Sequence, residues 1–149
     1  MIPSVPLVLN GLARTLLMDL LPRTAHPYSA QTLQLDAALA MMCAQEFDRA
    51  AARLAEENAA LTALLGDAAS VVADTSLRDA LHAATGPATP SLLVSALHER
   101  NRALRGLLVR LHAHVETLEG ESARGLEARI WAELAESTRR RQLDLAMPS

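Results

Sequence analysis

Apolar residues recur at intervals of three and four along most of the chain, the spacing that places side chains on one face of an α-helix. Prolines and glycines divide this pattern into segments. The segments predict four main helices, at about residues 6–21, 29–65, 90–119 and 122–145, and one short helix at about 75–84. Apolar and polar residues never alternate over a useful length, so no strand is predicted.

Local signals mark the expected helix ends. Ser4 or Val5 precedes Pro6 at the first start, and Pro22 follows the first helix at Leu21. Glycines just beyond an apolar series are preferred helix stops. The other expected ends are Gly66 and Gly120 as stops of the second and fourth helices, Thr75 or Ser76 as the cap of the short helix, Thr89-Pro90 as the start of the fourth, and Ser122 as the cap of the fifth.

The expected fold is all-α: an elongated antiparallel bundle of four main helices plus one short connector helix, in a single domain over residues 1–149. Half of the residues are apolar, and most of these are Leu and Ala, which favour helices packed on helices. At 1.5 Å per residue the two longest helices would be about 45–55 Å long. A compact globule of this chain length is only about 30 Å across, so an elongated bundle is predicted.

Two segments carry an asparagine in the same pattern. "EENAALTALL" at 56–65 and "ERNRALRGLL" at 99–108 both read E-x-N-x-x-L-x-x-L-L. Each asparagine fills a gap in an apolar series with heptad spacing. The two series are Leu33, Ala37, Ala40, Ala44, Phe47, Ala51, Leu54, Asn58, Leu61 and Leu65, and then Val94, Leu97, Asn101, Leu104, Leu108, Leu111, Val115 and Leu118.

An antiparallel pairing of the two helices would bring Asn58 level with Asn101. Residue numbers at one level then sum to about 159, which also sets Ala51 against Leu108 and Ala44 against Val115. Because a buried amide needs a hydrogen-bond partner, the two asparagines are predicted to satisfy each other and to fix the register. Two alternatives stay open: the asparagines line a polar pocket beside Glu57, His98 or Arg102, or they face solvent.

Charge and cysteine content narrow the possible partners. The formal net charge is −3, which gives no reason to expect nucleic acid or an anionic membrane as a partner. The single cysteine, Cys43, cannot form an internal disulfide, which fits a cytoplasmic protein. The apolar first helix contains Asn10, Arg14 and Asp19, so a helix buried in a bundle is expected rather than a membrane span.

The sequence lacks the spacings that characterise common catalytic and metal sites. There is no E-x-x-H, H-E-x-x-H, C-x-x-C or Gly-rich phosphate loop. Cys43 is read as a small core residue, His112 with Glu116 as an exposed pair, and Arg139 to Arg141 as a complement to the helix dipole. No catalytic residue, metal or cofactor is therefore expected, which favours a non-catalytic protein without excluding an enzyme.

The segments "LLMDLLP", "LDAALAMMCAQEF" and "EENAALTALLG" together resemble an uncharacterised bacterial all-helical family. Members of that family are often encoded beside acyl-CoA dehydrogenases and aminoglycoside-phosphotransferase-like proteins. The resemblance covers about residues 10–66. It implies an all-helical bacterial protein, and it implies no site residue because the family has no assigned chemistry.

The expected function is association with another protein, as a homodimer or with a different partner. The first helix is apolar on almost every side, and one neighbouring helix covers only a stripe about 100° wide. A second chain could cover the rest. The alternative is a protein that binds a small ligand or acyl group, or an enzyme accessory subunit, with its site in the bundle interior.

Overall fold

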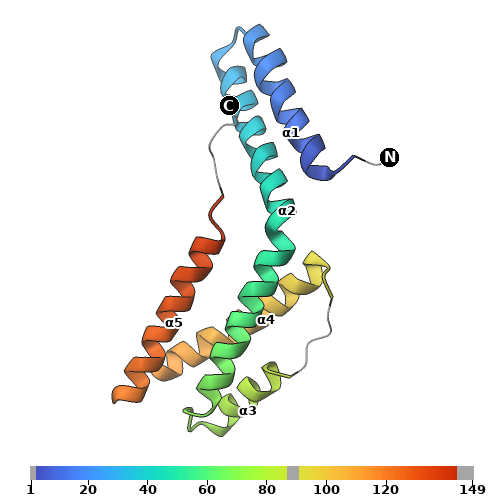
Figure 1. Cartoon of the computed structure of the whole chain (residues 1–149). Helices are drawn as coiled ribbons and strands as arrows, with labels where there is room; N and C mark the ends of the chain where they lie inside the picture. Colours follow the sequence, from blue (N-terminus) through green and yellow to red (C-terminus); the bar gives the residue numbers. More distant parts are fainter. Residues whose placement is uncertain (1–2, 87–90, 144–149) are drawn as a thin grey trace. The chain divides into compact units, whose positions relative to one another are not determined.

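The computed structural model describes residues 3–86 and 91–143, and within these ranges the fold is all-helical without strands. This confirms the predicted all-α class. The helices in chain order are α1 (Val5–Thr15), a π-helical turn η1 (Leu16–Leu20), a 3-10 turn η2 (Leu21–Arg23), α2 (Pro27–Ala69), α3 (Thr75–Ala84), α4 (Val94–Val115) and α5 (Glu121–Arg140) (Figure 1).

The helix starts agree with the sequence patterns in part. The helix α1 begins after Ser4 with a proline in its first turn, as expected. The helical conformation continues past the predicted end at Leu21. After α1 it passes through the wider π-helical turn η1 and then the tighter 3-10 turn η2, which ends at Arg23. The cap of α3 is Asp74, not Thr75 or Ser76, because its Oδ1 accepts a hydrogen bond of 2.7 Å from the backbone N–H of Leu77.

Gly66 was predicted to end the second helix, but α2 continues through it to Ala69. A Cβ atom added at Gly66 would lie 3.2 Å from Cγ2 of Thr85, at the end of α3. The glycine therefore allows α3 to approach α2 closely. Its role is packing between helices, a use of glycine that the chain-stop rule does not distinguish from a helix end.

We expect Gly66→Ala to be more stabilising when the methyl group of Thr85 is also removed than when it is kept. Alanine favours a helix interior over glycine by about 1 kcal/mol. In the wild-type background the Thr85 methyl must move, although the Thr85 hydroxyl is held by a 2.8 Å bond to the carbonyl of His82. Thr85→Ser keeps that hydroxyl. Urea unfolding should show a gain of about 0.5–1 kcal/mol for Gly66→Ala in the Thr85→Ser background and a smaller gain, or a loss, without it.

The later helix boundaries differ from the predicted ones. Thr89-Pro90 lies outside the described residues, and α4 begins at Val94 after a non-helical Leu93. The helix ends at Val115, before Gly120, which has φ of 111° and precedes α5 directly. Only glycine adopts that conformation freely, so Gly120 shapes the turn into α5 and Ser122 is not the cap. The helix α5 ends at Arg140, and its predicted end at Leu145 lies outside the described residues.

The chain forms two compact units, and α2 contributes to both. Among the described residues, the N-terminal unit contains 3–50 and 142–143, and the C-terminal unit contains 51–86 and 91–141. In the N-terminal unit, α1 lies beside the first part of α2 as a helical hairpin (Figure 1). Because α2 is one continuous helix, the division does not separate two domains by itself, and the single-domain organisation stays a prediction.

In the C-terminal unit, α3, α4 and α5 pack with the second part of α2 around one core. Adjacent positions of α2 are buried in pairs, such as Leu64 with Leu65 and Ala68 with Ala69, which widens the buried face of α2 beyond a single stripe.

The helix α5 runs antiparallel to α2, because Asp67 contacts Arg129 at 2.6 Å and Glu57 contacts Ser137 at 3.1 Å. The core contains Leu61, Leu64, Leu65, Ala68, Ala69, Val72, Leu77, Leu81, Leu104, Leu108, Leu111, Val115, Ala123, Leu126 and Ile130.

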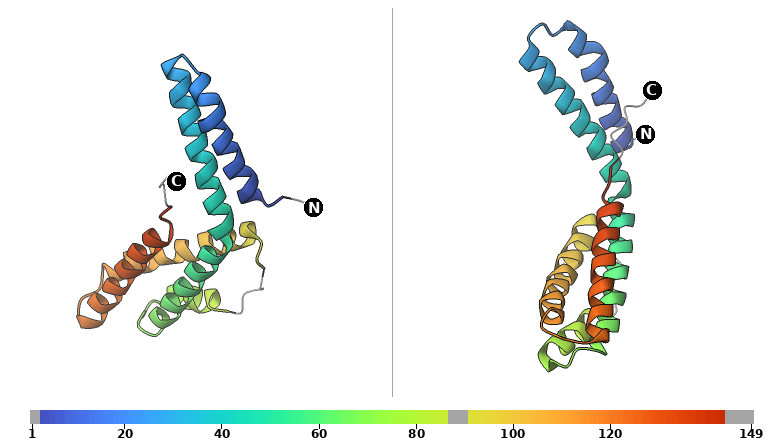
Figure 2. Two further views of the ribbon diagram at one scale, coloured as in Figure 1. Left: turned by 45° about the horizontal axis from the view of Figure 1, so that its top comes forward. Right: turned by 90° about the vertical axis from the view of Figure 1, so that its left-hand side faces the viewer.

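The helix α4 does not follow the antiparallel register predicted from the asparagines. Figures 1 and 2 show α4 crossing the second part of α2 and running toward the same end of the unit. Val115 packs in the core of the C-terminal unit, whereas Ala44, its predicted neighbour, belongs to the N-terminal unit. The reason is α3, which leads the chain back beside α2 before α4 begins, since Arg100 of α4 contacts both Ala84 of α3 and Thr62 of α2.

Candidate functional site

The two asparagines meet in the interior of the C-terminal unit. Both are buried, and the Nδ2 group of Asn101 donates a hydrogen bond of 2.9 Å to Oδ1 of Asn58. The Nδ2 group of Asn58 donates in turn to the carbonyl oxygen of Leu97, at 3.0 Å. The predicted contact is therefore present at the point where α2 and α4 cross, although the surrounding antiparallel register is not.

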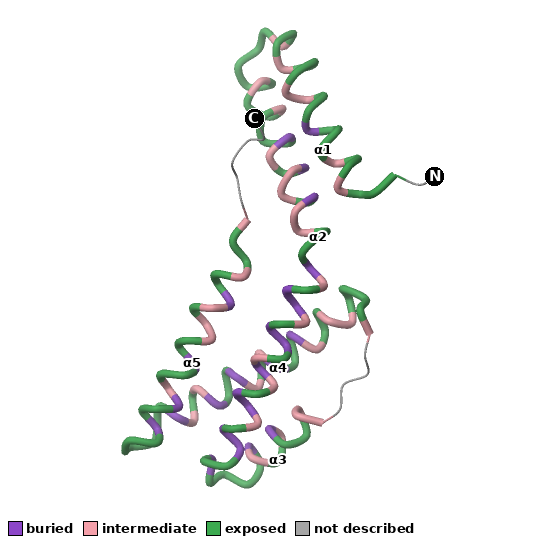
Figure 3. Tube along the Cα trace, viewed as in Figure 1, coloured by how far each residue is buried: buried purple, intermediate pink, exposed green. Residues whose placement is uncertain are grey.

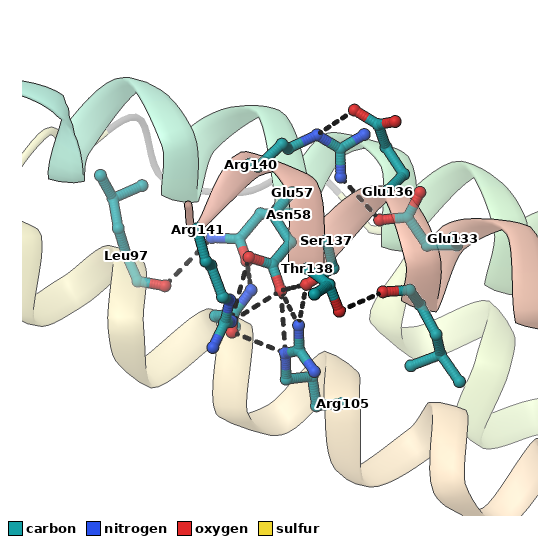
Figure 4. A network of polar contacts seen from close by, with 12 residues as sticks. Glu57, Asn58, Leu97, Arg105, Glu133, Glu136, Ser137, Thr138, Arg140 and Arg141 are labelled. Carbon is teal, nitrogen blue, oxygen red and sulfur yellow. Dashed lines mark hydrogen bonds and ion pairs between the residues drawn. The ribbon is translucent and has the colours of Figure 1, made fainter. Parts of the chain in front are cut away.

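Glu57 lies beside this pair as the centre of a larger polar network (Figure 4). Its fully buried carboxylate accepts a 2.8 Å bond from Nε of Arg105, and it also contacts Nη2 of that arginine. Arg141 reaches it from the end of α5 at 2.9 and 3.1 Å. The hydroxyl of Ser137 donates to it at 3.1 Å. We call Glu57, Asn58, Asn101, Arg105, Ser137 and Arg141 the Glu57 network.

Arg105 connects the two parts of the network. Its Nε group lies 3.2 Å from Oδ1 of Asn101, and its Nη2 group contacts Ser137. One chain of hydrogen bonds thus runs from the carbonyl of Leu97 through both asparagines and Arg105 to Glu57. The network ties α2, α4 and α5 together at one level of the unit.

The electrostatics of the network keep Glu57 ionised. Burial raises the pKa of Glu57, but hydrogen bonds from Arg105 and Arg141 and the positive charges of both arginines lower it by more. The net effect places the pKa of this carboxyl below its ordinary value of 4.5. A carboxylate held in its charged form by two arginines accepts protons poorly, so this arrangement suits a structural ion cluster better than a general base.

Only one of the three predicted pocket neighbours belongs to the network. Glu57 does, whereas His98 and Arg102 are exposed. Arg102 follows Asn101 directly, so its side chain is rotated by about 100° around the helix, away from the buried direction. Arg105, Ser137 and Arg141 were not predicted as site residues.

A usable signal existed for Ser137 but not for Arg141. Ser137 continues the buried series Ala123, Leu126 and Ile130 of α5 at helical spacing, so it is a polar residue in an apolar stripe, as the asparagines are. Arg141 was read as a complement to the helix dipole. Its position one residue beyond α5 shows no pattern, and only the packing of α5 on α2 brings it to Glu57.

A shallow groove of about 500 Å³ lies between α2 and α5 on the C-terminal unit, and it is the relevant place for the ligand-binding alternative. Alanines of α2 and charged residues of α5 line it. Those charged groups already form ion pairs, since Arg129 contacts Asp67 at 2.6 Å and Glu133 contacts Arg140 at 2.8 Å. The groove is open and offers paired charges, unlike the enclosed apolar pockets with convergent polar groups that bind small ligands.

The N-terminal unit differs from the C-terminal unit in that most residues of α1 are exposed (Figure 3), and large apolar residues are among them. Leu7, Val8, Leu12 and Met18 are each at least half exposed. Among the described residues one helical segment, Val5–Arg23, is long and apolar enough to cross a membrane, with a mean hydropathy of 1.3. Only 6% of it is buried, so the prediction of a first helix buried in a bundle is wrong, because α1 packs on α2 through the row around Ala13 and leaves its other sides exposed. Helices of a soluble protein's core and N-terminal signal sequences meet the same criterion, so the absence of a membrane contact and the cytoplasmic location stay predictions.

Within residues 3–86 and 91–143, no three histidine, cysteine, aspartate or glutamate side chains form a group that could hold a metal ion. Comparisons with family models, curated proteins and solved structures gave no match to this chain. The resemblance to the bacterial helical family therefore stays a prediction, and the function has to be argued from the structure.

Proposed function

We propose that this protein is a non-catalytic helical protein of the cytoplasm that acts through association, and that its principal association is with a second copy of itself. The observation that carries this proposal is the imbalance between the core and the surface of the N-terminal unit. Three alanines, Ala13, Ala37 and Ala40, form the buried core of the hairpin. The larger apolar side chains, including Val8, Leu12 and Phe47, lie mostly in solvent.

This imbalance makes association favourable. Burial of apolar surface contributes about 25 cal/mol per Å², and alanine side chains bury little area. The hairpin therefore gains limited stability from its own core, while its exposed leucines and valines could contribute on contact with a partner. Single exposed apolar residues are common on proteins, but many on two adjacent helices indicate an interaction surface.

The C-terminal unit supports the non-catalytic part of the proposal. The polar groups of the Glu57 network bind one another: Glu57 is held by Arg105, Arg141 and Ser137, and Asn58 by Asn101. A catalytic group needs a free face toward a substrate. The Glu57 network instead joins three helices, which suits a rigid support for the hairpin that associates.

Sedimentation velocity over a range of about 1 to 100 µM tests the proposal, because small interfaces dissociate in this range. We expect the mass to rise from 16.0 kDa at low concentration to a plateau at twice that value. A mass that stays at 16.0 kDa throughout would contradict the proposal. Growth without a plateau would also contradict it, because it indicates aggregation rather than a closed dimer.

A further inference from the structure

The contact between α1 and the first part of α2 fixes how the hairpin presents its side chains. Ala13 of α1 packs with Ala37 and Ala40 of α2, and the half-buried Leu16 and Met41 join them. Residue numbers at one level therefore sum to about 50–53, as in two antiparallel helices joined by the turn at residues 24–26. We call the residues in this contact the packed rows.

The residues directly before the packed rows form a second row on each helix. Leu12 precedes Ala13 on α1, and Leu39 precedes Ala40 on α2. A step of one residue is a rotation of about 100°, in the same sense on both helices. Because the helices are antiparallel, both second rows lie on the same side of the hairpin. Besides Thr15 and Asp36, these rows contain Val5, Val8, Leu12, Leu39, Cys43 and Phe47, and we call these six residues the apolar face.

All six residues of the apolar face are exposed. Phe47 and Cys43 were expected in the core, and the structure corrects both, because α1 covers only the packed row of α2. The opposite side of the hairpin carries Asn10, Arg14 and Gln34, and also the exposed Leu7 and Met18, which lie seven residues before Arg14 and four residues after it. The apolar face is the side on which exposed apolar side chains of both helices lie together, and a partner can cover it.

We propose that the apolar face docks on the same face of a second copy, so that two hairpins form a four-helix contact around a twofold axis near Cys43. This inference rests on the proposed function and specifies its surface. Two hairpins joined face to face reproduce the packing of a four-helix bundle. An isologous contact needs a self-complementary surface, and a row of aliphatic and aromatic side chains on both helices meets that need.

The charges of the N-terminal unit favour a protein over a lipid membrane as the partner of the apolar face. Its described residues hold three arginines against four carboxylates, so there is no positive excess to attract an anionic membrane. These residues are Arg14, Arg23 and Arg49, and Asp19, Asp36, Glu46 and Asp48. Asp36 also lies in the α2 row of the apolar face, beside Leu39, where a carboxylate would oppose insertion into hydrocarbon.

The position of Asp36 selects the orientation of the two copies. Two carboxylates brought together in an apolar contact would repel each other. Asp36 and Cys43 are seven residues apart, which is about 10 Å along the helix. A twofold axis that lies in the plane of the contact, perpendicular to the helices and at the level of Cys43, places the two Asp36 side chains about 20 Å apart along the helices, at opposite ends of the contact, and brings the two Cys43 thiols close together.

Cross-linking through the single cysteine tests this arrangement. The full chain is treated with a short bismaleimide at a concentration where sedimentation shows the dimer. We expect a covalent dimer from Cys43 and none from Cys43→Ser. The matched control is Cys43→Ser with Gln34→Cys, which places the thiol on the polar side of the hairpin and should give little cross-linked dimer.

Polar substitutions on the face provide a second, independent measurement. Val8→Gln with Leu12→Gln should weaken dimerisation at least tenfold, because each change removes apolar area from the contact. Both side chains are already about half exposed, so the helical circular dichroism should be retained. Phe47→Gln, on α2, should weaken the dimer in the same direction. Leu7→Gln, which changes an even more exposed residue of α1 outside the apolar face, is the control and should leave the dimer unchanged.

The possible failures separate the two proposals. A wild-type dimer that neither cross-links through Cys43 nor responds to Val8→Gln with Leu12→Gln would overturn this surface and leave the proposed association standing. A chain that is monomeric at every concentration would overturn both. Sedimentation of a monomeric chain with phosphatidylcholine vesicles, abolished by the same two substitutions, would overturn the second copy as the occupant of the face.

Discussion

Replacement of Arg105 by methionine is expected to lower the free energy of unfolding by about 2–3 kcal/mol at neutral pH. The change leaves the fully buried carboxylate of Glu57 with Arg141 and Ser137 alone, and it also removes a donor to Asn101. Breaking a completely buried ion pair typically costs about 3–5 kcal/mol. The smaller value is expected here because 33% of the Arg105 side chain is exposed and water can replace part of its contact.

The effect of Arg105→Met should depend on pH, which separates the loss of the ion pair from the loss of packing. The folded-state pKa of Glu57 lies below 4.5, so its contribution to stability is complete above about that pH and is lost as the pH falls through the folded-state pKa. In the variant, burial still raises the pKa of Glu57 while one of the two lowering arginines is gone. The difference between the two proteins should therefore narrow below about pH 4.5.

Urea unfolding at several pH values, followed by the fluorescence of Trp131, the single tryptophan, measures the free energy of unfolding of the C-terminal unit in both proteins. The matched control is Arg102→Met, which changes an exposed arginine three residues away on the same helix and should have an effect within about 0.5 kcal/mol. Equal effects of Arg105→Met and Arg102→Met on the free energy of unfolding would show that Glu57 is not held by Arg105. A loss of stability in Arg105→Met that stays constant between pH 3.5 and pH 7, roughly the span over which a carboxyl near 4.5 titrates, would show the same.

The second large effect is expected at the asparagine pair. Asn58→Leu leaves Nδ2 of Asn101 buried without its acceptor, and Asn101→Leu leaves Oδ1 of Asn58 without its donor. Each single change should cost about 1–3 kcal/mol. The double change removes both amides together. It still loses two other hydrogen bonds, the one from Asn58 to the carbonyl of Leu97 and the one from Arg105 to Asn101. Its cost should therefore be smaller than the sum of the single costs by about 1 kcal/mol or more.

A double-mutant cycle in urea measures this coupling. The control cycle combines Asn58→Leu with Ile130→Val, a core residue of α5 that lies near the level of Leu65, about one and a half to two turns further along α2. That pair should be additive within about 0.5 kcal/mol. Additive costs for the two asparagines would mean that their side chains do not support each other in solution.

The comparison of sequence with structure is clearest at these two asparagines. A polar residue that interrupts an apolar series has to find a polar partner, and two such residues were predicted to find each other. The 2.9 Å bond between them agrees with that reasoning. The antiparallel register built around them was wrong, because a single contact is compatible with helices that cross in either direction. Spacing along one helix carries no information on the direction of its neighbour.

The residues that complete the Glu57 network also show that spacing along one helix does not reveal which residues of other helices contact it. Glu57 was expected only as a neighbour of the pair, and its strongest partners, Arg105 and Arg141, look like ordinary surface arginines in the sequence. A buried carboxylate requires compensation, but many arginines could supply it. Arg141 is 84 residues away along the chain and reaches Glu57 only because α5 packs antiparallel on α2.

The sequence by itself determined the helical class and the approximate position of most helices, because three-four periodicity and helix propensity are local properties that depend on neighbouring residues. It also predicted that Asn58 and Asn101 pair in the interior, although a polar pocket and exposure to solvent were alternatives that the sequence left open. The tertiary structure decided that Gly66 makes room for Thr85, that α4 crosses α2 in the same direction, and that Cys43 and Phe47 are exposed while Glu57 is buried. These outcomes depend on which helix covers which face, and that choice is made by contacts between segments far apart in the chain.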